Sequence, residues 1–414
     1  MPNLVRTILC LPAILFAVVC ARPGQADDNV RIALTFPFSG PFGIYGDLYM
    51  REYQMFADDI NARGGVLGGR KLELVPLDNK NNPQEALVNL KFATDRRIPF
   101  IVQGAGSHVA LALADAVARH NAREPDNRLL YLNQSGDYDL ANSRCNFWTF
   151  LFDAHSEMRM EALISGLVDR PGIRRVFLIN QDYAHGQNVS REAKAILARR
   201  RPDVAVVGDD LHPLGRVKDF APYVAKIKAS GADAVITGNW GGDLALLIKA
   251  AGEAGLKADF YTFYGNGPGT PTAMGEAAID KVKVVYRWHP NIAGAPGESD
   301  NVRYRTRYGA DYYGLPVKVM LEMLVQAIDR AGTTEALAVA RALERVRYDS
   351  VTGPVWIRPE DHQLMQPLYL FTLTRADGRA IRYDFEGTGI GSRTDARIDP
   401  EDTALPTACK MRSP

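Results

Sequence analysis

The chain has 414 residues, of which 46% are apolar and 23% are charged, with 36 Gly and 24 Pro. Such a composition supplies a large core and excludes a disordered, collagen-like or coiled-coil chain. Lys and Arg total 49 against 48 Asp and Glu, a net charge of +1, so no global field attracts nucleic acid or an anionic membrane. We expect no nucleic-acid partner, and the length predicts two domains or three.

The first 26 residues have the pattern of an export signal. A short basic region at Arg6 precedes an apolar run over 8–21, and small residues lead to Ala26. This run is too short to cross a bilayer core of about 30 Å. We therefore expect a signal peptide over 1–26, cleavage near Ala26 and export of the mature chain, with lipidation at Cys20 as the alternative.

The number of cysteines is consistent with an exported protein. Four are present, and the predicted cleavage removes Cys10 and Cys20. Cys145 and Cys409 remain, and an even number in an exported chain favours one disulfide over a metal site or a catalytic thiol. Two separate free thiols are the alternative.

Short apolar strands alternate with amphipathic helices from residue 30 onward. The helix predicted over 47–63 repeats its apolar residues every three or four positions, and Gly64-Gly65 ends it. The other elements of this first run are strands over 30–35, 72–77, 100–103 and 129–132, with helices over 84–94 and 108–120.

The same alternation restarts after Cys145. Strands that alternate with helices form parallel sheets covered by helices on both faces. Two such runs predict an α/β protein with two doubly wound parallel-sheet lobes. The second run has strands over 176–179, 204–207, 234–237, 260–263 and 282–286, with helices over 187–200, 220–230 and 243–254.

The C-terminal part of the chain departs from this alternation. A helical stretch over 316–345 has no strands, and we expect it to return to the first lobe. A hairpin is predicted from a strand over 369–374, through a turn at Asp377-Gly378, to a strand over 381–385. The tail after Gly391 is polar, which predicts irregular structure anchored by Cys409.

The sequence contains no catalytic motif. It lacks the His-Glu-x-x-His, Cys-x-x-Cys and Gly-x-Ser-x-Gly patterns and a Walker-type phosphate loop. Pro268 and the glycine spacing at 265–269 do not fit a dinucleotide-binding fingerprint. This segment could be either a sharp turn or a loop that contacts a ligand. We expect a protein that is not an enzyme and that uses no cofactor and no metal.

The loops after the predicted strands favour ligand binding, because open α/β folds bind ligands at the carboxyl ends of their strands. Ser107 lies directly before a helix, where its hydroxyl and free N–H groups would receive a carboxylate. A plain helix N-cap is the alternative role for this serine. Trp240 lies between glycines in another such loop, which makes it a candidate for ligand contact.

The segment from Asp59 to Asp78 resembles the signature of a known family. It contains Asp59-Ile60-Asn61, followed by glycine pairs at 64–65 and 68–69. This order resembles periplasmic solute-binding proteins of the leucine/isoleucine/valine type, which serve ATP-binding-cassette (ABC) importers. Shorter matches are Ser39-Gly40-Pro41, Tyr45-Gly46-Asp47 and 252–256, so that the resemblance covers about residues 28–390.

The resemblance implies the fold of the type I periplasmic binding proteins. In that fold, two lobes joined by three chain crossings move about a hinge and close on a ligand. Carried over by position, the first lobe covers 27–149 plus 288–364, and the second covers 150–287 plus 365–390. A C-terminal tail follows over 391–414.

The resemblance also implies a ligand site. The family's carboxylate-binding serine matches Ser107, and a second carboxylate contact falls at Ser135 or Gly136. Where branched-chain binders have an acidic residue for the ligand ammonium, this chain has Asn266. The expected ligand-contact residues, including the aromatic walls, are Tyr45, Ser107, Ser135, Gly136, Tyr183, Trp240 and Asn266.

Such a protein would be the extracytoplasmic solute-binding component of an ABC importer, located in the periplasm, a monomer with a membrane permease as its partner. The expected ligand is a small carboxylate, in the first place an apolar or branched-chain amino acid. Because Asn266 offers only a neutral amide, an aromatic or other organic acid without an ammonium group is the alternative. A ligand-sensing receptor domain, which shares the fold, is the alternative class of protein.

Overall fold

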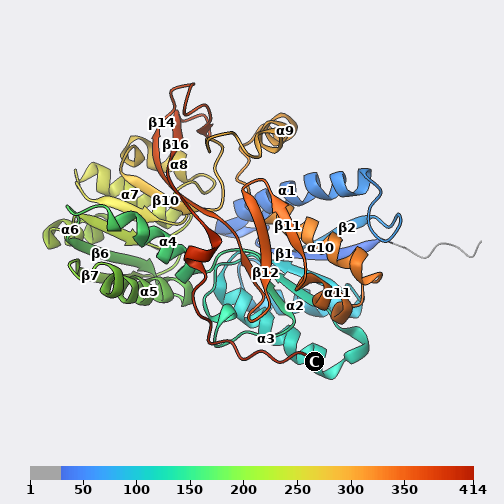
Figure 1. Cartoon of the computed structure of the whole chain (residues 1–414). Helices are drawn as coiled ribbons and strands as arrows, with labels where there is room; N and C mark the ends of the chain where they lie inside the picture. Colours follow the sequence, from blue (N-terminus) through green and yellow to red (C-terminus); the bar gives the residue numbers. More distant parts are fainter. Residues whose placement is uncertain (1–28) are drawn as a thin grey trace, which may run out of the picture.

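The computed structural model describes residues 29–414 and contains two eight-stranded sheets. Each sheet with its helices forms one lobe, and the two lobes lie side by side (Figure 1). We call the lobe that begins the described chain the first lobe, drawn mainly in blue, cyan and orange. The second lobe is drawn mainly in green and yellow. The prediction of two doubly wound α/β lobes is confirmed.

The sheet of the first lobe has the order β11-β12-β13-β5-β4-β3-β1-β2. Strands β2, β1, β3, β4 and β5 run parallel to one another. The strands are β1 Val30–Phe36, β2 Leu72–Asp78, β3 Phe100–Gln103, β4 Leu130–Asn133, β5 Thr149–Leu151, β11 Arg347–Ser350, β12 Gly353–Arg358 and β13 Gln363–Met365. The helices are α1 Gly43–Ala62, α2 Pro83–Asp95, α3 Ser107–Arg123, α9 Glu298–Tyr308, α10 Val317–Ala331 and α11 Ala336–Leu343.

The sheet of the second lobe has the order β15-β16-β14-β10-β9-β8-β6-β7. Its strands are β6 Arg175–Gln181, β7 Ala205–His212, β8 Ala234–Thr237, β9 Asp259–Thr262, β10 Val282–Tyr286, β14 Leu368–Arg375, β15 Asp384–Phe385 and β16 Ile390–Ile398. Its helices are α4 Ser156–Val168, α5 Ala184–Arg200, α6 Ala221–Ser230, α7 Gly242–Glu253 and α8 Thr270–Met274.

The glycine pair at 64–65 turns the chain from α1 into β2. Gly65 has a φ of +67°, and a Cβ at this position would lie 2.1 Å from the carbonyl oxygen of Arg70. No other residue type fits this combination of left-handed backbone and close approach. The glycine signature in the sequence therefore reflects a tight connection between the first helix and the second strand.

The chain passes between the two sheets at three places, after β5, after β10 and after β13. The boundary expected at residue 150 falls within β5, so the last residues of that strand belong to the sheet of the first lobe. Helices α10 and α11 return to the first lobe as predicted, where α10 packs against α1. The three crossing segments lie next to one another beside the candidate site described below.

Two predictions for the C-terminal part were wrong. Strand β14 pairs with β16 rather than with 381–385, and within that range only β15 forms, adding two residues to the edge. Residues 391–398 are part of β16 and not an irregular tail. The polar residues Arg393, Asp395 and Arg397 alternate with more buried ones in β16, so a polar sequence still forms a strand with one solvated face.

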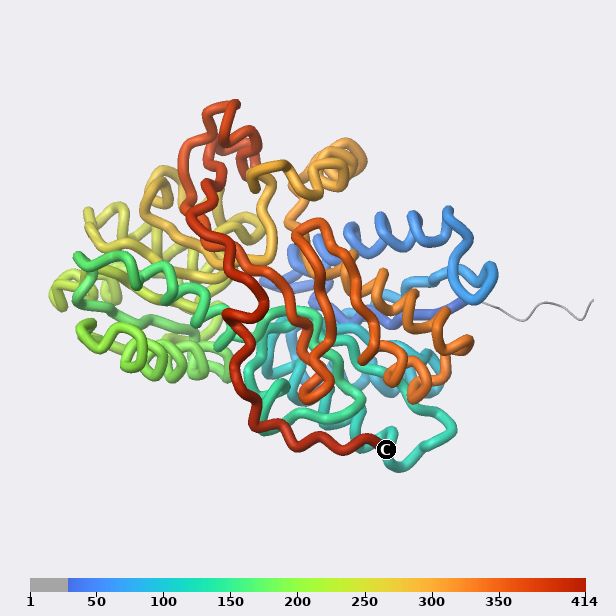
Figure 2. Tube along the Cα trace, viewed as in Figure 1, coloured from blue at the N-terminus to red at the C-terminus, as the bar shows by residue number. Residues whose placement is uncertain are grey.

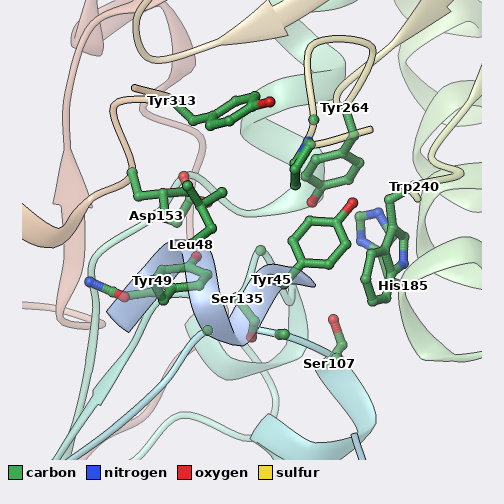
Figure 3. A pocket seen from close by; sticks show the side chains of 18 of the residues that line it. Tyr45, Leu48, Tyr49, Ser107, Ser135, Asp153, His185, Trp240, Tyr264 and Tyr313 are labelled. Atoms are coloured by element: carbon green, nitrogen blue, oxygen red, sulfur yellow. The ribbon is translucent and has the colours of Figure 1, made fainter. Parts of the chain in front are cut away.

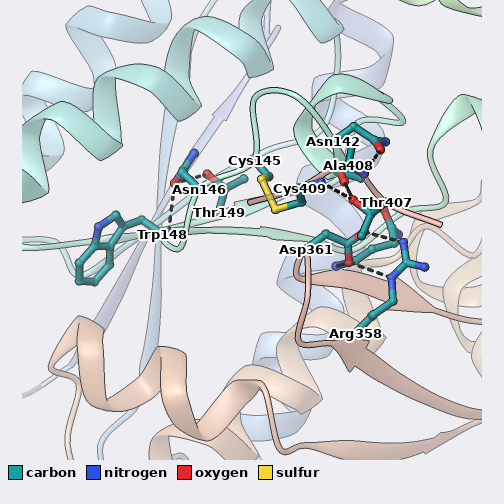
Figure 4. The surroundings of a disulfide bond; sticks show 12 residues. Asn142, Cys145, Asn146, Trp148, Thr149, Arg358, Asp361, Thr407, Ala408 and Cys409 are labelled. Carbon is teal, nitrogen blue, oxygen red and sulfur yellow. Dashed lines mark hydrogen bonds and ion pairs between the residues drawn. A yellow bond between two sulfur atoms is a disulfide. The ribbon is translucent and has the colours of Figure 1, made fainter. Parts of the chain in front are cut away.

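Cys145 and Cys409 form a disulfide, as predicted, with their Cα atoms 5.7 Å apart. Beyond β16 the chain leaves the second lobe and runs along the first lobe to the C-terminus, shown in dark red in Figure 2. Hydrogen bonds from Thr407 to the Ala141 carbonyl, 2.5 Å, and from the Ala408 N–H to Asn142 Oδ1, 3.0 Å, flank the bridge (Figure 4). The disulfide thus fastens a fourth connection between the lobes.

Within residues 29–414, no helix combines the length and the apolar content needed to cross a bilayer. The signal peptide predicted over 1–26 and the alternative lipidation at Cys20 lie outside the described residues.

We predict that the double substitution Cys145→Ser with Cys409→Ser lowers the free energy of unfolding by about 2–5 kcal/mol, because the bridge closes a long loop in the unfolded chain. Urea unfolding of the oxidised protein and of the double variant measures this difference. The same double variant with and without reductant is the control, since it has no bridge to lose. An unchanged urea midpoint for the variant would contradict a stabilising bridge.

Candidate ligand-binding site

A pocket lies between the two lobes and encloses about 750 Å³ that no protein atom fills, part of it open to solvent (Figure 3). All seven residues expected from the sequence line it: Tyr45, Ser107, Ser135, Gly136, Tyr183, Trp240 and Asn266. Other lining residues with polar or aromatic side chains are Tyr49, Gln134, Asp153, His185, Tyr264, Tyr286 and Tyr313.

The carboxyl ends of three adjacent parallel strands form the first-lobe side of the pocket. Ser107 follows β3, Ser135 and Gly136 follow β4, and Asp153 follows β5. Gly106 makes the turn into α3 possible, because its φ is +84° and a Cβ there would lie 2.2 Å from Asn81 Oδ1. The strand order therefore lines up these residues along one edge of the sheet.

Gly106, not Ser107, is the N-cap of α3, and no side chain caps this helix. The alternative role of Ser107 as a plain N-cap is therefore wrong. As the first helical residue, Ser107 has no carbonyl one turn earlier for its N–H, and the same holds for His108. Both N–H groups make no hydrogen bond to any described residue. They lie at the positive end of the helix dipole, and Ser107 lines the pocket.

Both hydrogen-bond donors of Ser135 are already paired within the protein. Its hydroxyl donates to Asn133 Oδ1 at 2.9 Å, and its N–H donates to the same oxygen at 3.1 Å. The N–H of Gly136 makes no hydrogen bond to any described residue. Of the two positions expected to give a second contact, Gly136 is the one that offers a free donor.

A buried carboxyl lies behind Ser107. Asp137 is 1% exposed, and its Oδ1 accepts the N–H groups of Asp139 and Leu140. Its Oδ2 has no hydrogen-bond partner among the described residues. Burial raises the pKa of Asp137 to about 6, although the nearby Ser107 hydroxyl acts to lower it. The sequence predicted a ligand contact at Ser135 or Gly136 but did not predict a role for this carboxyl.

Aromatic side chains from both lobes meet across the pocket. Tyr45 in α1 and Trp240 in the second lobe lie edge to face, with ring centroids 5.1 Å apart. Trp240 Nε1 donates to the Tyr183 hydroxyl at 2.8 Å, which leaves the proton of that hydroxyl free for another acceptor. The two lobes thus contact each other around the site, and the walls are rigid apolar surfaces with polar tips.

Sequence reasoning missed several tyrosines that line the pocket. Tyr49 lies four residues after Tyr45 and belongs to the apolar repeat of α1, and it stacks on Phe36 with ring centroids 4.4 Å apart. Tyr264 and Tyr286 lie at the carboxyl ends of β9 and β10. The same rule that selected Ser107 and Trp240, a polar or aromatic residue at a strand end, was the available signal for both.

The lining residues carry little free negative charge. His185 is neutral, because burial and the nearby Arg159 lower its pKa to about 4. Asn266 is a neutral amide with no hydrogen bond to a described residue. Asp153 is the single acidic residue among those lining the pocket, and two arginines pair with it. No lining carboxylate within residues 29–414 is free to receive an ammonium group.

Comparison with known proteins shows which family this chain belongs to. Residues 29–379 match the family described as periplasmic binding protein. The chain belongs to this family. Its members are substrate-binding proteins of ABC transporters and not enzymes, which confirms both the resemblance and the expected lack of catalysis. Leu/Ile/Val-binding protein homolog 4 from Brucella melitensis biotype 1 is 31% identical, over 94% of this chain and 94% of that protein.

Solved structures of this family have the same fold. The leucine-, isoleucine-, valine-, threonine- and alanine-binding protein from Brucella ovis, in a closed conformation, is 29% identical with a TM-score of 0.85, over 93% of this chain and 100% of that chain. A solute-binding protein from R. palustris in complex with benzoate has a TM-score of 0.76 at 17% identity, over 92% of this chain and 99% of that chain. At this identity, the likeness shows only that the fold is shared. The lobes are those of type I periplasmic binding proteins.

Replacing Asp137 by Asn should stabilise the protein at neutral pH. The pKa of this carboxyl is raised from 3.8 to about 6, so the folded state holds its proton more tightly than the unfolded chain does. Its contribution to stability is fully present below about pH 4 and is lost as the pH rises through about 6. We expect Asp137→Asn to raise the free energy of unfolding by up to about 3 kcal/mol at pH 7.5, and by little at pH 4.

Urea unfolding at the two pH values measures the difference. Asp377→Asn is the control, because backbone N–H groups of Arg379 and Ile381 lower the pKa of this turn carboxyl, and its loss should have the opposite sign. An Asp137→Asn variant that is equally destabilised at both pH values would contradict the assignment.

Proposed function

We propose that the chain is the extracytoplasmic component of an ABC importer and that it captures a small organic acid between its lobes. The observation that carries this proposal is the group of unpaired donors at the first-lobe wall. The N–H groups of Ser107, at the start of α3, and of Gly136, after β4, belong to residues that line the pocket, and the N–H of His108 is the next unpaired donor of α3. A carboxylate would satisfy several of these donors at once.

The charge around the pocket supports an acid without an ammonium group. An ammonium needs a carboxylate or carbonyl partner, whereas Asp153 is paired and Asn266 is neutral. Tyr45 and Trp240 would hold the apolar part of the ligand. The benzoate complex of a protein with the same fold supports this class of ligand.

An apolar amino acid is the second candidate. Gln134 lines the pocket, and its side-chain oxygen is buried without a hydrogen-bond partner among the described residues. That oxygen is the acceptor that an ammonium group would use. The names of the Brucella melitensis and Brucella ovis relatives support this candidate.

Capture would proceed by closure of the lobes. Ser107 and Tyr45 belong to the first lobe and Trp240 to the second, so neither lobe encloses a ligand alone. Closure excludes water, which strengthens the hydrogen bonds to the carboxylate. The closed protein would then deliver the acid to a membrane permease from the periplasm.

Calorimetry with two matched pairs tests the ligand class: leucine against 4-methylpentanoate, and phenylalanine against 3-phenylpropanoate. We expect the acid without the ammonium group to bind at least as tightly in each pair. Ser107→Ala should weaken binding about tenfold or more, because a hydrogen bond to a charged group contributes about 1.5–3 kcal/mol.

Ser165→Ala is the matched control, because this serine bonds the Ala162 carbonyl within α4, away from the pocket. If both amino acids bind more tightly than their deaminated acids, the result would favour an apolar amino acid as the ligand. Unchanged affinity in the Ser107→Ala and Trp240→Ala variants would contradict the proposed site.

A further inference from the structure

A buried charged cluster closes one end of the pocket. Asp153 pairs with Arg159 of α4 through Oδ2 at 2.5 Å and with Arg287 after β10 through Oδ1 at 2.5 Å. The side chains are 7%, 1% and 8% exposed respectively, so all three charges are held away from bulk water. Asp153 itself lines the pocket.

This cluster contains more positive than negative charge. Both guanidinium groups share one carboxylate, and Arg159 Nη1 and Arg287 Nε have no hydrogen-bond partner among the described residues. Glu52 also acts on Arg287, but burial raises the pKa of Glu52 to about 8, so its carboxyl is mostly protonated at neutral pH. A buried positive charge without a partner is unfavourable, and an anion supplied by a ligand would balance it.

Two tyrosines connect the cluster to the pocket. Arg287 Nη1 donates to the Tyr286 hydroxyl at 2.9 Å, so that hydroxyl must direct its own proton elsewhere. Arg159 lies over the ring of Tyr264, 5.2 Å from its centroid. Both tyrosines line the pocket, and neither hydroxyl donates to a described residue. They are phenol donors backed by cations, without an acceptor inside the protein.

This end of the pocket is distinct from the start of α3. Ser107 follows β3 and Asp153 follows β5, with β4 between them. The two residues therefore follow strands that are not direct neighbours in the sheet. Figure 3 shows Ser107 and Asp153 on opposite sides of the pocket, with Ser135 between them. Gly136 lies between the two ends: a Cβ on it would lie 3.7 Å from the Tyr264 hydroxyl, so a second acid group would bind next to Gly136 and the first at Ser107.

We propose that the Tyr264 and Tyr286 hydroxyls, backed by Arg159 and Arg287, form a second anion subsite and that the ligand is an organic acid with two carboxylates. The first carboxylate would lie at the start of α3 and the second at these hydroxyls. This inference rests on the proposed function. It adds that the end of the ligand opposite the first carboxylate is acidic and not purely apolar. It applies to diacids with or without an ammonium group.

Calorimetry of the mature protein with two pairs of probes tests the inference: benzoate against terephthalate, and leucine against glutamate. In whichever pair binds, the diacid should bind at least tenfold more tightly than the monoacid, because it adds hydrogen bonds to a charged group. Tyr286→Phe and Tyr264→Phe should each lower the ratio of diacid to monoacid affinity about fivefold or more.

Tyr304→Phe is the matched control, because Tyr304 is buried with an unpartnered hydroxyl but does not line this pocket, and it should leave the ratio unchanged. A monoacid that binds as tightly as its diacid overturns the second subsite while the proposed function stands. A ratio that neither Tyr264→Phe nor Tyr286→Phe changes also overturns it. Absence of binding by all four probes overturns the proposed capture of an organic acid, and the inference with it.

Discussion

The N–H groups of Ser107 and His108 cannot be paired within α3, because the first residues of a helix have no carbonyl one turn before them. The fold leaves these donors at the carboxyl edge of a parallel sheet, and Gly106 is the residue that lets the chain turn there without a capping side chain. The second lobe then covers this edge with Trp240 and Tyr183, which limits access of water. No described residue supplies an acceptor for these two N–H groups.

The charged cluster links this site to the connections between the lobes. Asp153 lies in the first crossing segment, Arg287 directly follows β10 in the second, and Gln363 of β13, near the third, donates to the Asp153 carbonyl at 2.9 Å. Arg159 joins them from α4 of the second lobe. An anion bound near Tyr264 and Tyr286 would therefore act on the segments that connect the lobes. The disulfide-fastened tail adds a further link between the lobes, on the side of β16.

Most of the fold could be predicted from the sequence, because buried parallel strands are short apolar runs and their helices have a clear period. Strand β16 was missed because its alternation of Arg393, Asp395 and Arg397 with smaller residues looks like a polar tail unless its partner β14 is known. Ser107 and Trp240 could be selected because they follow strands. Asp153, Arg159 and Arg287 could not be grouped, since only the crossing of the chain between lobes brings Arg287 to the other two. The pairing of Ser135 with Asn133 likewise depends on the folded loop.

Mass spectrometry of the small molecule released from protein purified out of the periplasm tests most directly whether the pocket is built for an anion. The unpaired donors at α3 and the excess positive charge beside Asp153 predict an organic acid bound one per chain, released on unfolding and present in a smaller amount in the Ser107→Ala variant. Recovery of a neutral or purely cationic molecule in that stoichiometry would contradict the account.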